Sequence, residues 1–354
     1  MNIAIVARTA KRKGGTETYL FDLVRGFRQA GHAVDVFTAV DGKRSAAREA
    51  GATVHVSPVS LIPSSIRPWV FRAALRTRFD RHRYDLTISL ARLNGQDLAI
   101  CGGTHRGFLQ ATGRAAGLRD RSEIALEERC YRESGLIVAH SSRMRRELID
   151  MYEMAPAKVQ VIHPPVDSSV YYPADDATRV ATKPRFGLST DRMTLLFPST
   201  GHERKGLPLL LETLASLPES EFELAVAGSD SGKFRQLPHV KYLGFIENMA
   251  DLYRAVDCTI LPAHYEPYGL VVTESMACGT PVIAHAQVGA CDVMRPDEGV
   301  VVDELTVPAL RAAILAARER TFCIHAGFVR ERGLELSQHI ERLITARGVL
   351  ERCA

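Results

Sequence analysis

Residues 264–274 read His-Tyr-Glu-Pro-Tyr-Gly-Leu-Val-Val-Thr-Glu, and this stretch decides the fold of the second half of the chain. It follows an apolar run at residues 258–262 that predicts a buried strand, and it opens an amphipathic helix expected to end near Gly279. Glu266 therefore lies on a strand-to-helix loop, and Glu274 lies on the helix. In an open parallel sheet such a loop lies at the carboxyl edge of the strands, where ligands bind.

The same loop combines a helix N-terminus with two carboxylates. The backbone N–H groups of Tyr268, Gly269 and Leu270 are expected at the helix start, which suits a phosphate group. The carboxylates of Glu266 and Glu274 can accept hydrogen bonds from sugar hydroxyls beside it. The alternative is a pair of solvated glutamates on a surface helix. The flanking packing signals, Gly-Leu-Val and Ala-Cys-Gly-Thr-Pro-Val, favour the ligand site.

A second candidate loop, residues 199–206, reads Ser-Thr-Gly-His-Glu-Arg-Lys-Gly and lies between an expected strand and an expected helix. Arg204 and Lys205 are adjacent cations at a helix start, where the macrodipole disfavours positive charge unless an anion binds between them. Arginine binds phosphate oxygens with a planar fork, and lysine acts as a point charge. We therefore expect a diphosphate here; the alternative is a solvated surface pair.

Two glycine-containing loops in the first half are weaker candidates. Gly14 and Gly15 connect the first expected strand to the first expected helix, so the backbone there could approach an anionic ligand closely, or could form a simple tight turn. The third glycine of a dinucleotide-binding Gly-x-Gly-x-x-Gly is missing. Residues 102–107, Gly-Gly-Thr-His-Arg-Gly, follow a later strand and offer His105, with Arg106 as a possible acceptor or phosphate contact. A satisfied structural histidine is the alternative for His105.

Short apolar strands alternate with helices along the whole chain, which predicts an α/β protein with doubly wound parallel sheets. The length of 354 residues favours two domains. We expect an N-terminal domain over residues 1–168, a C-terminal domain over 169–335 and a terminal helix over 336–354. Tyr171-Tyr172-Pro173, after two prolines at 164 and 165, has the composition of a linker.

Charge is distributed unevenly between the halves. Residues 1–165 carry 26 Lys/Arg against 16 Asp/Glu, and the remainder carries 19 against 25, giving +10 and −6, which together equal the total of +4. This asymmetry suggests that the first half faces an anionic partner. Zinc spacing, a helix-turn-helix signal and interleaved aromatics are absent from the sequence, so we expect no nucleic acid and favour an anionic membrane surface.

Residues 66–83 are the segment most typical of a membrane contact, because they hold six arginines and the only tryptophan. Apolar residues at 71, 75 and 79 form a stripe, with Arg72, Arg76 and Arg83 beside it. This pattern fits an interfacial helix on anionic lipid. It fits equally a helix packed on the sheet with a solvated basic face.

The seven cysteines are scattered and lie mostly in apolar runs, which is typical of a reducing compartment. The sequence opens directly on a strand, and no apolar run approaches the ~18 residues of a transmembrane helix. A cytoplasmic protein is expected, at most peripheral on the inner face of the cytoplasmic membrane. The oligomeric state is not indicated.

The motifs together resemble the retaining GT-B glycosyltransferases that carry a glutamate–seven–glutamate motif, and the pattern is closest to bacterial lipopolysaccharide-core transferases. The resemblance covers nearly the whole chain. It implies two Rossmann-like domains facing across a cleft, with the last helix packing back on the first domain. It also implies a nucleotide-diphosphate sugar as donor and a glycan or glycolipid as acceptor.

The resemblance assigns a role to each candidate. Glu266 would bind hydroxyls of the donor sugar, Glu274 the nucleotide ribose, and Arg204 with Lys205 the leaving diphosphate. The remaining positions implied by the family are a glycine loop near the diphosphate, a histidine near the transferred sugar and a nucleobase loop: Gly14, Gly15, His105, Gly244 and Phe245.

No metal and no cofactor are expected. No two aspartates are separated by one residue, so the Asp-x-Asp metal motif of the other glycosyltransferase fold is absent. The cation pair would neutralise the leaving group in place of a metal ion.

The sequence therefore predicts a retaining, metal-independent glycosyltransferase that moves a hexose-type sugar to a cell-envelope acceptor. Three rivals remain. A sugar-nucleotide epimerase would need carboxylates and histidines placed for elimination, and a phosphorylase would need a pyridoxal lysine. A binding-only relative with a decayed site is disfavoured, because both glutamates, the cation pair and the glycine turn are present.

Overall fold

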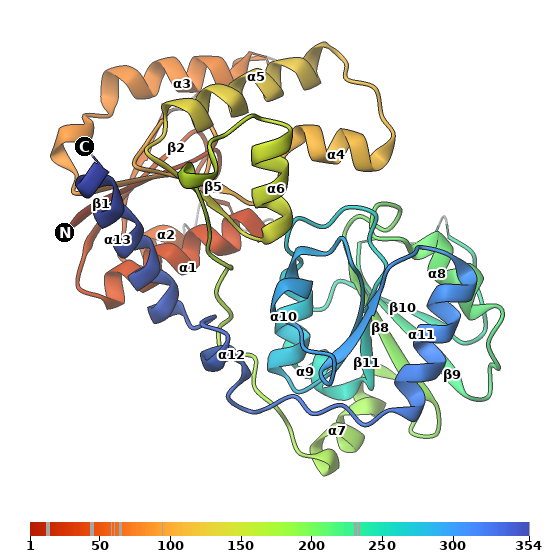
Figure 1. Ribbon diagram of the computed structural model, residues 1–354. Helices are drawn as coiled ribbons and strands as arrows, with labels where there is room; N and C mark the ends of the chain where they lie inside the picture. The colour runs from red at the N-terminus through yellow and green to blue at the C-terminus, as the bar shows by residue number, and fades with distance from the viewer. Residues whose placement is uncertain are drawn as a thin grey trace. The chain divides into compact units, whose positions relative to one another are not determined.

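The computed structural model describes residues 1–11, 15–42, 46–57, 59, 61–63, 66–93, 95–229, 232 and 234–353. The chain divides into two compact units, each with its own parallel sheet and core (Figure 1). The first unit comprises Met1–Pro165 together with Leu334–Ala354, and the second comprises Val166–Gly333. The doubly wound parallel α/β class expected from the sequence is confirmed in both units.

The sheet of the first unit has the order β3-β2-β1-β4-β5-β6-β7, with all described neighbours parallel. Its central strands are almost fully buried, because their apolar side chains are covered on both faces. The strands are β1 (Asn2–Ala7), β2 (Ala33–Thr38), β3 (Thr53–Val56), β4 (Leu86–Ser89), β5 (Leu98–Cys101), β6 (Leu136–Ala139) and β7 (Val159–Val161).

Helices cover both faces of this sheet. On one face α1 (Gly15–Gln29) and α13 (Leu336–Cys353) share a core with the strands, and on the other α3 (Arg67–Arg78) and α5 (Leu118–Glu133) do so (Figure 1). The last helix thus packs on the first unit. The other helices of the unit are α2 (Ala46–Glu49), α4 (His105–Thr112), α6 (Ser142–Asp150) and the 3₁₀ turns η1 (Arg81–Arg83) and η2 (Pro156–Lys158).

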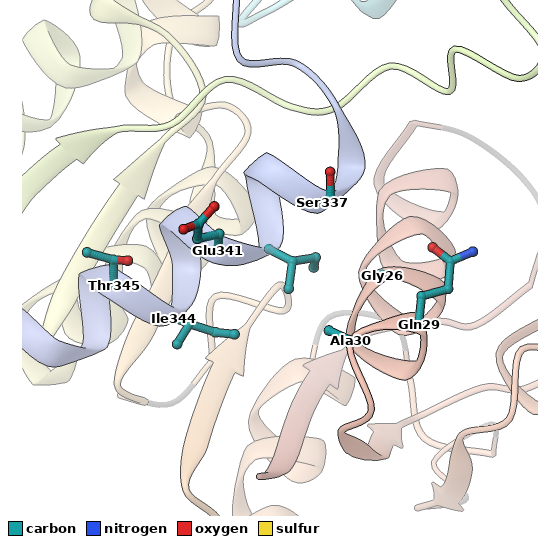
Figure 2. A pocket seen from close by; sticks show the side chains of 8 residues that line it. Gly26, Gln29, Ala30, Ser337, Glu341, Ile344 and Thr345 are labelled. Carbon is teal, nitrogen blue, oxygen red and sulfur yellow. The ribbon is translucent and has the colours of Figure 1, made fainter. Parts of the chain in front are cut away.

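The contact between α1 and α13 depends on a small residue. A Cβ added at Gly26 would lie 2.6 Å from Cγ1 of Ile340, so glycine lets the two helices approach closely. A cavity of about 310 Å³ remains beside this contact, with an apolar floor that includes Ala30 and Ile344 and polar side chains such as Gln29 and Glu341 around it (Figure 2).

The apolar stripe of residues 66–83 lies in the core of the first unit. Phe71 and Leu75 are buried in the core, so the apolar stripe packs on the sheet and is not free to enter lipid. Arg72 is only 6% exposed, donates from Nε to the Leu93 carbonyl at 2.7 Å, and pairs with Glu133 at 3.3 Å. The expectation that Arg72 belongs to a lipid-facing surface is therefore wrong.

The sheet of the second unit has the order β10-β9-β8-β11-β12-β13 and is also parallel. Its strands are β8 (Met193–Ser199), β9 (Phe222–Gly228), β10 (Val240–Gly244), β11 (Cys258–Leu261), β12 (Val282–His285) and β13 (Gly299–Val302). Helices α8 (Leu207–Leu214) and α11 (Val307–Glu319) pack on one face, and α9 (Met249–Ala255) and α10 (Leu270–Ala277) lie on the other (Figure 1). The unit also contains α7 (Asp176–Thr182), α12 (Phe328–Glu331), η3 (Lys183–Phe186) and η4 (Gly289–Val293).

The strand order places a binding edge in the second unit. From β8 the chain proceeds outward to β9 and β10, and it then returns to the other side of β8 as β11. The order therefore reverses between β8 and β11, and the loops that follow these strands meet at the carboxyl edge of the sheet. Such a topological switch point is where open α/β sheets bind ligands.

None of the helices that the structure describes combines the length and the apolarity needed to span a membrane.

Candidate functional site

The two loops at the switch point carry the charged residues singled out in the sequence. Strands β8 and β11 are direct neighbours, with Cys258 opposite Leu195, so the loops that leave them run side by side. A backbone hydrogen bond joins the loops, from the His264 N–H to the Arg204 carbonyl at 3.0 Å. The rigid sheet thus sets the separation of the cation-bearing and carboxylate-bearing segments.

Glu266 lies between the two cations. Its Oε2 atom is 3.2 Å from Nη1 of Arg204 and 3.5 Å from Nζ of Lys205. Arg204 also donates to the Tyr265 carbonyl, and Lys205 donates to the Pro198 carbonyl at 3.4 Å. The three side chains are therefore held by both loops and form one cluster.

The cluster has an excess of positive charge in a partly desolvated place. Only 11% of the Lys205 side chain and 14% of the Glu266 side chain are exposed, against 30% for Arg204. One carboxylate cannot neutralise two cations, and opposite unit charges about 4 Å apart attract by about 4 kcal/mol at an effective dielectric constant near 20. A multiply charged anion would therefore be attracted strongly to this cluster.

Glycines shape both loops. Gly206 has φ +88°, and a Cβ added there would lie 2.1 Å from the Pro262 carbonyl oxygen. Gly269 has φ +94°, and a Cβ there would lie 3.1 Å from Cγ of Glu266. Glycine is needed at both positions, because the left-handed conformation and the close approach each disfavour a side chain. The last residue of the Arg-Lys-Gly pattern thus lets the cation loop lie against the neighbouring strand end.

Glu274 lies behind this cluster, on α10, and is bound by tyrosines. The Tyr253 hydroxyl donates to Oε2 of Glu274 at 3.0 Å. Burial, the charge of Glu274 and a hydrogen bond to it together raise the pKa of Tyr171. The Glu274 carboxylate is therefore fixed in place by two phenol groups, which the sequence did not point to.

The remaining second-unit candidates lie at the start of α10 and at the end of β10. Tyr268 is buried, its carbonyl accepts from the Ala290 N–H at 2.7 Å, and Leu270 begins α10. Gly244 ends β10 with φ +66°, and the Phe245 side chain that follows is 81% exposed. The aromatic ring and the adjacent backbone are thus accessible in the second unit.

His105 lies in the first unit, at the start of α4. Thr104 caps this helix by accepting from the Gly107 N–H at 3.0 Å. Nε2 of His105 is 2.8 Å from Oδ1 of Asp120, and Nη2 of Arg114 lies 2.6 Å from the same oxygen. The hydrogen bond to His105 is the main cause that lowers the pKa of Asp120. The imidazole is therefore oriented by a carboxylate.

A buried carboxylate, Glu127, accepts hydrogen bonds at the start of the same helix. It is 2% exposed and accepts from the His105 backbone N–H at 3.0 Å, from Arg92 and from the Tyr152 hydroxyl. Arg92 in turn donates to the Gly103 carbonyl at 2.7 Å. This network fixes the backbone that presents His105.

The structure gives less support to a binding role for two other candidates of the first unit. Arg106 pairs with Glu128, donates to the Met151 carbonyl at 2.6 Å and stacks on the Tyr152 ring at 5.1 Å, so its contacts tie α4 to its neighbours. Gly15 is the exposed first residue of α1, whereas Gly14 lies outside the described residues. Among the described residues, no cluster of three or more His, Cys, Asp or Glu side chains is arranged to bind a metal ion.

Comparison with known proteins identifies the family. The family model described as Glycosyltransferase Family 4 matches residues 13–170, and the one described as Glycosyl transferases group 1 matches residues 179–320. A probable transglycosylase of Burkholderia thailandensis is 38% identical over 93% of this chain and 89% of its own length. The chain therefore belongs to this family of GT-B glycosyltransferases, as the resemblance in the sequence predicted.

More distant relatives agree with this assignment. A D-inositol 3-phosphate glycosyltransferase of Geodermatophilus obscurus is 28% identical over 90% of this chain and 81% of its own length. The structure of WaaG, a glycosyltransferase involved in lipopolysaccharide biosynthesis, matches with a TM-score of 0.77 at 19% identity, covering 99% of this chain and 98% of that one. Sucrose-phosphate synthase from Thermosynechococcus elongatus matches with a TM-score of 0.72 at 20% identity, with the same coverage. These two structures support the fold.

Proposed function

We propose that this glycosyltransferase is retaining and metal-independent, and that it moves a hexose-type sugar from a nucleotide-diphosphate donor to a glycan or glycolipid of the cell envelope. The observation that carries the proposal is the Arg204, Lys205 and Glu266 cluster at the switch point of the second sheet. Cations that already share one carboxylate can rearrange onto a diphosphate, and the carboxylate then becomes available for sugar hydroxyls.

The reaction needs charge stabilisation more than it needs a strong base. The bond between the anomeric carbon and the β-phosphate oxygen breaks, and its electron pair stays on that oxygen. The acceptor hydroxyl forms the new bond on the same face and gives its proton to the departing phosphate oxygen. Arg204 and Lys205 would stabilise the negative charge that develops there. Atoms and charge balance without a metal ion.

The other candidates take roles around this step. Glu266 would accept hydrogen bonds from the transferred sugar, and Glu274 from the ribose. Amides at the start of α10, around Tyr268 to Leu270, would contact phosphate, since a helix N-terminus favours anions. The backbone at Gly244 and Phe245 would hold the base. His105 would orient the sugar and not deprotonate the acceptor. Gly14 and Gly15 would approach the diphosphate.

Two observations favour an acceptor of the cell envelope. WaaG, which shares the fold, is a lipopolysaccharide glycosyltransferase, and the first unit is strongly basic. The relatives also include inositol 3-phosphate glycosyltransferases, so a phosphorylated polyol is a second candidate acceptor. Both acceptor classes are anionic, which agrees with a basic first unit.

Donor hydrolysis without an acceptor tests the proposed reaction. We expect the protein to cleave UDP-glucose or GDP-mannose slowly to the nucleoside diphosphate, because water can replace the acceptor. Radiolabelled donors give the products, and proton NMR of the first-formed free sugar gives its anomeric configuration. Appearance of an epimerised sugar nucleotide would favour the rival epimerase, and an inverted anomer would exclude a retaining mechanism.

We also propose that the α3–α5 face of the first unit, defined by Ile66, Trp69 and Leu118 with neighbouring exposed arginines, binds an anionic membrane. Leu118 is 86% exposed, Ile66 is 51% exposed and Trp69 is 37% exposed. Trp69 of α3 donates to Ser122 of α5 at 2.9 Å, so the two helices form one surface. Apolar side chains among arginines are typical of interfacial binding.

Vesicle sedimentation at two salt concentrations checks this surface. Replacing the exposed Arg76, Arg119 and Arg121 together by serine should weaken binding to vesicles with acidic lipid by about 10²-fold at low salt, since each surface arginine contributes about 1 kcal/mol. The matched control replaces three exposed arginines of the second unit, Arg185, Arg311 and Arg330. Arg72 is left intact, because its burial would confuse folding with binding. Equal binding by both triple variants would exclude this face.

A further inference from the structure

A cavity of about 380 Å³ lies at the amino edge of the second sheet, opposite to the carboxyl edge that carries the cluster described above. Met193, which lines it, is the first residue of β8, and Asp257 and Pro281 directly precede β11 and β12. Strand β8 is seven residues long, so about 20 Å of strand separates the two edges. A ligand in this cavity would therefore occupy a different site from the proposed donor.

Three arginines contribute to the lining of this cavity: Arg179 in the last turn of α7, Arg318 in the last turn of α11 and Arg320 directly after α11. Among the described residues that line it, Asp257 is the only carboxylate, and it pairs with Lys183 at 2.7 Å. The cavity thus holds an excess of positive charge, although residues 166–354 carry 19 Lys/Arg against 25 Asp/Glu. An anion is the ligand that such a charge attracts.

Backbone carbonyls hold two of the three guanidinium groups in place. Nη2 of Arg179 donates to the Val256 carbonyl at 2.7 Å, and Nη2 of Arg320 donates to the Pro296 carbonyl at 2.7 Å. Arg320 also lies 5.2 Å from the centre of the ring of Phe322, which lines the same cavity. A guanidinium has five N–H donors, so both groups keep donors for a ligand after binding a carbonyl. Their orientation is set before any ligand binds.

The third guanidinium, that of Arg318, is held more weakly. It pairs with Glu221, and 44% of the Arg318 side chain and 40% of the Glu221 side chain are exposed. It also lies 5.2 Å from the centre of the Phe222 ring. Exposed ion pairs contribute little to stability, because water screens them and two long side chains must be ordered. Arg318 can therefore turn towards an anion in the cavity at little cost.

We propose that this cavity binds the phosphate group of a small organic phosphate, at a site separate from the donor site. Planar guanidinium groups donate paired hydrogen bonds to phosphate oxygens, and several of them balance a dianion. A free phosphate ion would leave much of the cavity empty, because about 380 Å³ is typical of pockets that enclose small organic ligands. The ring of Phe322 and the side chain of Met193 offer an apolar surface for the organic part.

The arginines have a simpler explanation as counter-charges for helix ends. Cations in the last turn of a helix interact favourably with its macrodipole, and Arg179 and Arg318 have that position. This role would change the stability of the second unit by the same amount with and without phosphate. A phosphate site adds an effect that appears only when the ligand is present. Binding measurements therefore separate the two roles.

Isothermal titration calorimetry with glucose 1-phosphate, glucose 6-phosphate and inorganic phosphate tests the inference. The titrations use the variant Lys205→Ala, because the cluster at the carboxyl edge could also bind phosphate. We expect at least one of the two sugar phosphates to bind about 3- to 10-fold more tightly than inorganic phosphate, because the organic part adds contacts. Adding R318Q and R320Q should weaken binding by about 10²-fold, about tenfold for each charged hydrogen bond lost.

The matched control adds R185Q and R311Q to Lys205→Ala, which removes two exposed arginines of the same unit that lie outside the cavity. All three affinities should stay unchanged in this control. Thermal unfolding, followed by circular dichroism with and without the tighter sugar phosphate, checks that the variants fold. The variant with R318Q and R320Q should unfold cooperatively and lose only the rise in Tm that the ligand produces.

Three results would overturn the inference. No binding of any of the three phosphates by Lys205→Ala, or equal binding by the cavity variant and its control, would leave the arginines as counter-charges for helix ends. Binding of inorganic phosphate as tightly as both sugar phosphates would exclude an organic phosphate as the ligand. None of these results bears on the proposed function, because donor hydrolysis by the unmodified protein tests that separately.

Discussion

Replacing Arg204 or Lys205 by alanine is expected to lower the rate of donor cleavage by about 10²-fold or more, as for other preorganised charges aimed at a developing anion. Both side chains already sit in the partly desolvated cluster with Glu266, at 3.2 and 3.5 Å. They need little reorganisation to meet a leaving diphosphate, so the loss should appear mainly in kcat. Steady-state hydrolysis of the donor measures the effect.

A matched control and a metal test complete this experiment. Arg185→Ala removes the same charge from the second unit at a position that is 67% exposed and pairs with Asp251, so its activity should stay near that of the unmodified protein. EDTA should leave the unmodified protein active, because the cation pair supplies the neutralising charge. Loss of activity on chelation, with recovery on adding Mg²⁺ or Mn²⁺, would contradict this mechanism.

Much of the fold was predictable because the strands are buried on both faces. The run Asn2–Ala7 is apolar after its first residue, the run Leu98–Cys101 is apolar throughout, and the structure places strands at those same residues. Local sequence does not indicate the three-residue strand Val159–Val161, since it is too short to show a pattern and carries a glutamine at its centre. Strand order also lies beyond local patterning, because it depends on contacts distant in sequence.

Part of the candidate site, too, could be predicted from the sequence, and part could not. Arg204, Lys205 and Glu266 could be singled out because their misplaced charges and glycines are visible in short stretches, and the structure brings the three together. Their catalytic roles remain predictions. Tyr171 and Asp120 could not be found, because each acts on a residue far along the chain or across a loop and neither belongs to a motif.

Arg72 shows the opposite error. Counting arginines along a helix predicted an exposed basic face, but the direction of one side chain depends on its position relative to the sheet. At Arg72 the guanidinium turns inward and satisfies the Leu93 carbonyl and Glu133. A long cationic side chain can thus be buried when a carbonyl and a carboxylate accept its hydrogen bonds. Buried arginines such as Arg72 must therefore be left out before arginine counts from a sequence are used to define a basic surface.

Acidification is expected to destabilise the first unit well before its carboxylates are protonated. His140 and His339 are buried, and burial lowers their pKa values to about 3 and about 4. His339 is held between the Tyr19 hydroxyl at 2.8 Å and the His163 carbonyl at 2.9 Å, and it joins α13 to α1. No partner is recorded for Nε2 of His140 within the described part of the chain.

The free energy of unfolding falls with pH because the unfolded chain binds protons at a higher pH than the folded chain does. Both folded-state pKa values lie below the ordinary 6.5, so the unfolded chain takes up protons first as the pH falls. The stabilisation is complete above pH 6.5 and is lost progressively towards pH 3–4. Each of the two histidines lowers the free energy of unfolding by about 1.4 kcal/mol for each pH unit in this range. The free energy of unfolding should therefore fall by about 2–4 kcal/mol between pH 6.5 and 5.

Urea unfolding at several pH values measures this loss, and the fluorescence of Trp69, the only tryptophan, reports on the first unit. Among the described residues, the titratable groups that act on the two histidines are Tyr19, His163 and Arg342, and these three supply no negative charge to offset protonation. His339→Gln should therefore flatten the pH dependence by about half, because a neutral amide cannot be protonated. The matched control His55→Gln, at a side chain 45% exposed, should leave the slope intact. A free energy of unfolding that stayed constant from pH 7 to 5 would mean that the buried histidines accept protons without cost, and the tie between α1 and α13 would then have to rest on its apolar contacts alone.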